Sequence, residues 1–90
     1  MNFDKALHRL RTKAKLTRYR LAMEANVDPG HVGRLERGER RHPNRDLVLR
    51  LSQALLDNSG DLTLEDVDWL LKAAGYGPLP RNHVSIRPYR

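Results

Sequence analysis

The chain has 90 residues, no cysteine and a formal net charge of +6. This length suits one small domain with a single core, and the lack of cysteine excludes disulfides and thiolate metal ligands. No apolar run approaches the roughly 20 residues of a membrane span, so we expect a cytoplasmic protein.

The positive charge belongs to the first half of the chain. Residues 1–45 contain 12 lysines and arginines and 5 acidic residues, whereas residues 46–90 contain 5 and 6. Clustered basic side chains attract phosphate whatever the base sequence, so a polyanion is the first partner to consider. The alternative is a solvated basic face that only aids solubility.

A first helix is predicted from Asp4 to about Ala14, because apolar residues recur there at alternating steps of four and three. Basic residues take most of the other positions. A basic amphipathic helix can also lie on a membrane. This apolar stripe is narrow and lacks tryptophan, which favours packing in a core.

Two short helical patterns follow, and we expect each to open with a side-chain cap. The first begins after Thr17, and the second begins after Asp28 with Pro29 in its first turn. Between them, Asn26 suits the left-handed conformation that a sharp turn requires, and Gly38 ends the second helix. The pattern predicts a helix-turn-helix over residues 16–38.

Two further helices are predicted after this motif. Asn44 caps one that extends from Arg45 to about Leu56. Thr63 opens the other with a capping box, and that helix ends at Gly75.

Beyond residue 77 the helical period ends. We therefore expect an all-α, compact five-helix domain over residues 1–77 and a basic, flexible C-terminal tail over residues 78–90. In the tail Val84 and Ile86 alternate with polar residues, so a dimerisation strand completed by a partner subunit is the alternative.

The motif region resembles the Cro and phage-repressor (XRE-type) family of lambda-repressor-like folds. The matching positions are Leu16, Thr17, Leu21, Ala22, Ala25, Val27, Val32, Leu35, Glu36, Gly38, Arg41 and Pro43. The resemblance implies a transcriptional regulator that binds double-stranded DNA sequence-specifically, as a repressor rather than an activator. It also implies a homodimer on a palindromic site, in a bacterial or phage-type cytoplasm and associated with the nucleoid.

In this family the second helix of the motif enters the major groove. The groove-facing, base-contacting positions that the resemblance implies here are Pro29, Gly30, His31, Gly33 and Arg34. Arg34 is the best candidate, since a guanidinium can bond bidentately to guanine O6 and N7. His31 is equally well explained as a solvated or phosphate-touching residue. The two glycines either let the helix backbone approach the bases or indicate a surface of low specificity.

The resemblance also supplies candidates for contact with phosphate. They are Arg18, Arg37, Arg40, Arg41, Arg45, Tyr19 and Lys13. It further implies a structural ion pair between Arg11 and Glu36. Because few side chains of the motif can contact bases, we expect phosphate contacts and DNA shape to supply an unusually large share of the binding.

Neither an enzyme nor a metal site is predicted. The four histidines lack metal-ligand spacing, and helix capping explains most of the acidic group near Asp66. We expect no cofactor and no small-molecule ligand.

The predicted dimer surface consists of the tail and four residues near the last helix: Leu62, Leu64, Trp69 and Tyr76. Trp69 is equally well explained as a core residue. The alternative function is a protein-interaction module, such as an antitoxin-like or adaptor subunit, with weak or non-specific nucleic-acid binding.

Overall fold

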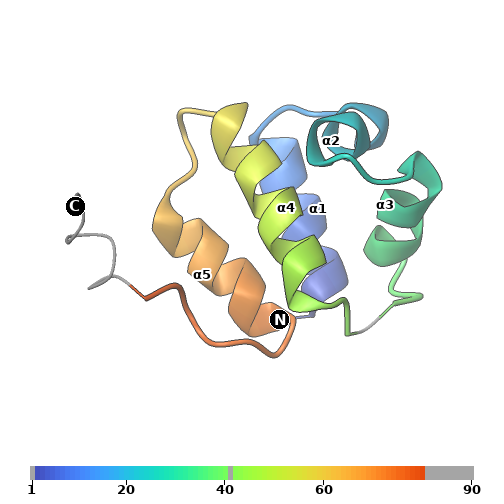
Figure 1. Cartoon of the computed structure of the whole chain (residues 1–90). Coiled ribbons are helices and arrows are strands. Elements are labelled where there is room, and N and C mark those ends of the chain that lie inside the picture. The colour runs from blue at the N-terminus through green and yellow to red at the C-terminus, as the bar shows by residue number, and fades with distance from the viewer. Residues whose placement is uncertain (1, 41, 81–90) are drawn as a thin grey trace.

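Five α-helices follow one another along the chain in a computed structural model, which describes residues 2–40 and 42–80 (Figure 1). They are α1 (Phe3–Lys13), α2 (Arg18–Ala25), α3 (Pro29–Glu36), α4 (Arg45–Asp57) and α5 (Leu64–Ala73). No strand occurs among these described residues. The predicted all-α, five-helix fold is confirmed.

Side-chain caps begin three of the helices at the predicted residues. The Thr17 hydroxyl accepts a hydrogen bond from the Arg20 N–H at 3.0 Å, and the Asn44 side-chain Oδ1 atom accepts from the Leu47 N–H at 2.8 Å. Thr63 forms a complete capping box. Each cap satisfies backbone donors that the first turn of a helix leaves without a partner.

The predicted side-chain cap on α3 is wrong. Asp28 is the N-cap residue, but its side chain makes no capping hydrogen bond. The carboxylate instead lies 3.9 Å from the Arg34 Nη2 atom, so an ion pair competes with the cap. Pro29 in the first turn has no N–H and needs no acceptor there.

The turn between α2 and α3 has the predicted left-handed residue. Asn26 adopts φ 58° and ψ 49°, and the Val27 N–H donates to the Ala22 carbonyl at 2.9 Å. This tight turn fixes the angle between the two helices of the motif.

The helices enclose one apolar core. Helix α1 packs against α3 and α5, α4 packs against α2 and α5, and α2 packs against α3. Figure 1 shows the pair α2 and α3 at one end of the molecule and α5 at the other. Because Val32 and Leu35 are fully buried, α3 is fixed to the core along one side and its other side is free for a partner.

Part of the predicted dimer surface belongs to the core instead. Leu62 is buried, because the loop before α5 turns it inward. Tyr76 and Trp69 are partly buried against the core, and the Tyr76 hydroxyl donates to the Pro43 carbonyl at 2.7 Å. Leu64 remains exposed. The predicted tail strand lies at residues 81–90, outside the described residues.

Gly38 ends the turn after α3 with a φ of +80°, which favours glycine. An added Cβ would also lie 3.3 Å from the Asp4 Oδ2 atom. We expect Gly38→Ala to lower the free energy of unfolding by about 1 kcal/mol in denaturant titration. Gly60→Ala is the control, since a Cβ there meets nothing within 4 Å. Equal losses in the two variants would contradict the prediction.

Candidate nucleic-acid interface

The predicted base-contacting residues on α3 differ in how far they are exposed to solvent. Arg34 and Gly30 are exposed, whereas Pro29 and His31 are half-buried. Arg34 is therefore the long, charged side chain that α3 itself presents to solvent. A guanidinium in this position has free N–H donors for an acceptor such as a base edge.

The surroundings of His31 favour the neutral form of its imidazole. Partial burial lowers the pKa of its imidazole below 6.5, and the nearby Arg40 and Arg34 cations lower it further. A neutral imidazole can donate one hydrogen bond and accept another, but it offers no charge to a phosphate. These properties favour a base or a water as its partner.

Side chains of neighbouring residues occupy the space that the two glycines of α3 leave open. Gly33 is buried, because the Arg37 Nη1 atom lies 3.0 Å from the position of an added Cβ. Gly33 shares the outer side of α3 with Gly30 and Arg34 and is covered there by the exposed side chain of Arg37, so its contact with bases stays a prediction. At Gly30 an added Cβ would lie 3.0 Å from the Asp28 Oδ2 atom and 3.3 Å from the Arg34 Nη1 atom.

The candidates for phosphate contact differ in whether an acidic group already holds them. Within residues 2–40 and 42–80, Lys13, Arg40 and Arg45 are exposed and form no ion pair. By contrast, the Arg37 Nε–H donates to the Glu39 carboxylate at 2.7 Å. The three unpaired cations can take up a phosphate without first losing a partner.

Three other candidates have different surroundings. The Arg18 Nε–H donates to the Glu36 carboxylate at 3.0 Å, so Arg18 already has a structural partner. Tyr19 is largely exposed on α2, where its hydroxyl is free to reach a phosphate oxygen. Arg41 lies outside the described residues.

Glu36 at the end of α3 is the centre of a cluster of ionic contacts. Its side chain is only 1% exposed, and Arg11 beside it is 12% exposed. Arg11 donates to both carboxylate oxygens, with Nη2 3.0 Å from Oε1, and its Nη1 also donates to the Leu16 carbonyl at 2.7 Å. The pair thus links α1 to α3 and to the segment before α2.

Two further side chains reach the same carboxylate, and neither contact was predicted from the sequence. Arg18 donates from α2, and the His8 Nδ1 atom of α1 lies 3.2 Å from Glu36 Oε1. The signal for His8 was present, because it precedes Arg11 by three positions and so shares its face of α1.

The pKa of the Glu36 carboxyl reflects two opposing effects. Burial alone would raise it, but the hydrogen bonds from Arg11, Arg18 and His8 lower it below the ordinary value of 4.5. Glu36 is therefore ionised at neutral pH and balances the positive charge that surrounds it.

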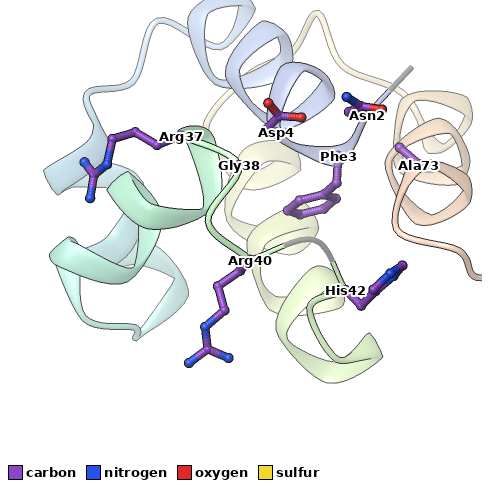
Figure 2. Close-up of a pocket in the computed structure, with 8 residues that line it drawn as sticks. All are labelled: Asn2, Phe3, Asp4, Arg37, Gly38, Arg40, His42 and Ala73. Atoms are coloured by element: carbon purple, nitrogen blue, oxygen red, sulfur yellow. The ribbon is translucent and has the colours of Figure 1, made fainter.

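A hollow of about 470 Å³ lies beside this surface, where the start of α1, the loop after α3 and the end of α5 meet. Figure 2 shows that Arg37 and Arg40 at its rim point away from Asp4 and from each other. The hollow therefore does not gather cations around one ligand. Instead, both arginine side chains extend into solvent, where a phosphate backbone can approach them.

Within residues 2–40 and 42–80, no group of three His, Asp or Glu side chains could hold a metal ion. None of the helices in this described part is long and apolar enough to cross a membrane.

The short pair α2 and α3, its tight turn and its basic outer side define a helix-turn-helix domain that binds DNA. A family model described as helix-turn-helix matches residues 7–55, just over half of the chain. The chain belongs to this family, of the Cro and phage-repressor (XRE) type. It is a DNA-binding domain of the kind found in transcription regulators. Neither a curated protein nor a solved structure matched the chain.

Proposed function

We propose that this protein binds double-stranded DNA sequence-specifically, with α3 in the major groove. The observation that carries the proposal is the outer side of α3. It presents Arg34 to solvent with the half-buried His31 on the same helix, while Val32 and Leu35 fix the opposite side to the core. A guanidinium on a rigid helix suits bidentate contact with guanine.

The proposed grip on the phosphate backbone flanks this helix. Arg40 in the loop after α3 and Arg45 at the start of α4 are exposed and form no ion pair among the described residues, and Lys13 ends α1. Contacts of this kind position a recognition helix without specifying bases. Arg37 can join them if it leaves Glu39.

We further propose that the protein acts as a homodimer on a palindromic site, in the cytoplasm and on the nucleoid. One helix-turn-helix covers too little DNA for high specificity, and two-fold symmetry doubles the contacts. A dimer bound across a promoter excludes other proteins from that site, so repression is the proposed outcome.

Selection of duplexes from a random pool tests this function. We expect the wild type to enrich a palindromic sequence. Arg34→Ala should lose the preference for one guanine in each half-site, by about 10- to 100-fold in relative affinity.

Lys72→Ala on α5 is the control for the selection, because it also removes an exposed cation but lies on a helix remote from α3. It should leave the enriched sequence unchanged. A preference that survives in Arg34→Ala would eliminate Arg34 as the base-contacting residue. No enrichment by the wild type would overturn sequence-specific binding.

A further inference from the structure

An acidic side chain stands within the basic surface of α3. The Asp28 carboxylate lies 3.9 Å from the Arg34 Nη2 atom, and the side chains of Asp28 and Arg34 are 71% and 44% exposed. Both groups are therefore exposed on the side of α3 that would enter the major groove. From the sequence, Asp28 was predicted only to cap α3.

The two side chains meet above Gly30. They come from positions six residues apart, and any side chain at position 30 would stand between them. An added Cβ at Gly30 would lie 3.0 Å from Asp28 Oδ2 and 3.3 Å from Arg34 Nη1. The absence of that Cβ gives the two charged groups their space.

The missing cap is a second observation on the same carboxylate. An aspartate in the N-cap position usually accepts a hydrogen bond from a backbone N–H of the first turn, but Asp28 does not. Its carboxylate is thus directed toward Arg34 and not toward the backbone of α3. Its acceptor oxygens remain available on the exposed side of the helix.

We propose that Asp28 is a specificity-determining residue that contacts DNA together with Arg34. Asp28 holds the guanidinium at the N-terminal end of α3 and itself accepts a hydrogen bond from the exocyclic amino group of a cytosine. This inference rests on the proposed function.

The hydrogen-bonding groups of the two side chains suit contact of Arg34 with guanine and of Asp28 with cytosine. Arg34 has five N–H donors, so one edge can face Asp28 while others reach guanine O6 and N7. A carboxylate is the side chain that accepts from cytosine N4 in the major groove. The pair thus offers donors for a guanine and an acceptor for a neighbouring cytosine from one place on α3.

On other DNA sequences the negative charge of Asp28 weakens binding. Where no amino group meets the carboxylate, it is desolvated without a partner and repelled by nearby phosphates. Asp28 therefore lowers affinity for non-matching DNA, which distinguishes it from a phosphate-contacting cation.

Asp28→Asn tests the proposal, because it removes the charge with almost no change of shape and keeps a good N-cap residue. The affinities of wild type and variant are measured at one salt concentration for three duplexes. These are the sequence that the wild type selects from a random pool, the same sequence with its cytosines replaced, and an unrelated duplex. We expect the variant to bind the unrelated duplex more tightly and the ratio of selected to unrelated affinity to fall about tenfold.

Two further variants separate the pair from general charge effects. Asp61→Asn removes the same charge from an exposed residue before α5, at the other end of the molecule, and should leave the ratio unchanged. Gly30→Ala keeps both charged groups but fills the space between them, so it should lower the ratio although alanine favours the helix.

The double variant Asp28→Asn with Arg34→Ala completes the test. If the two residues act together, Asp28→Asn should change the ratio much less when Arg34 is already absent. A wild type with a clear preference and an Asp28→Asn variant with the same ratio would overturn this inference alone. A wild type with no preference would overturn the proposed function as well.

Discussion

Glu36→Ala is expected to lower the free energy of unfolding by about 3–5 kcal/mol. The substitution removes a carboxylate whose side chain is 1% exposed and leaves the Arg11 guanidinium, which is 12% exposed, without its partner. A buried charge without a counter-charge is strongly destabilising. Thermal unfolding followed by circular dichroism should show a melting temperature lower by more than about 10 °C.

Glu39→Ala is the matched control for Glu36→Ala. Glu39 also accepts a hydrogen bond from an arginine, but its side chain is 52% exposed, and such surface pairs contribute about 1 kcal/mol at most. At a temperature where both variants are folded, Glu36→Ala should bind DNA nearly as the wild type does. An unchanged melting temperature would contradict the structural role of Glu36.

The same cluster makes stability depend on pH. Because its contacts hold the pKa of the folded Glu36 below 4.5, ionised Glu36 stabilises the fold at all pH values above 4.5. This contribution is lost as the pH falls below 4.5 and through the folded pKa. The difference in stability between wild type and Glu36→Ala should therefore narrow in acid, provided that both are compared at equal ionic strength.

The caps and turns of this chain could be predicted from sequence because each is decided within a few residues. Thr17, Asn44 and Thr63 each need only the N–H groups of the following turn, and Asn26 needs only its own backbone conformation. Hydrophobic spacing then placed the five helices. The family match over residues 7–55 agrees with the positions that carried the resemblance.

Asp28 shows where such local reasoning fails. A cap was expected there, but an arginine six positions later competes for the carboxylate, and Gly30 leaves the space for that contact. The burial of Gly33 beneath Arg37 has the same origin. A glycine has no side chain of its own, so a rule that considers one position at a time predicts no contact there. It therefore misses side chains of other residues that occupy the space beside the glycine.

The contacts of Glu36 could be predicted only in part. Arg11 was implied by the family, but Arg18 and His8 reach Glu36 because α1, α2 and α3 converge at that point. This convergence depends on how the three helices pack, which hydrophobic spacing does not specify. Arg18, which was predicted to contact phosphate, therefore also has a partner inside the protein.

The affinity for duplex DNA is expected to fall steeply with salt. Each phosphate that a cation neutralises contributes about 0.9 to the slope of log affinity against log salt. A surface that contacts about six phosphates should lose roughly three orders of magnitude in affinity between about 50 and 200 mM salt. Fluorescence anisotropy with a labelled duplex, titrated at several salt concentrations, measures the slope. No binding even at low salt would instead favour a protein-interaction module.

The salt slopes of alanine variants then show which residues neutralise phosphates. Arg40→Ala and Arg45→Ala should each reduce it by about 0.9 per subunit, because neither cation is paired among the described residues. Arg37→Ala should have a smaller effect on affinity, since binding first costs Arg37 its contact with Glu39. Lys72→Ala on α5 should leave the slope unchanged. Equal effects of Lys72→Ala and Arg40→Ala would mean that overall charge, and not the surface around α3, attracts the DNA.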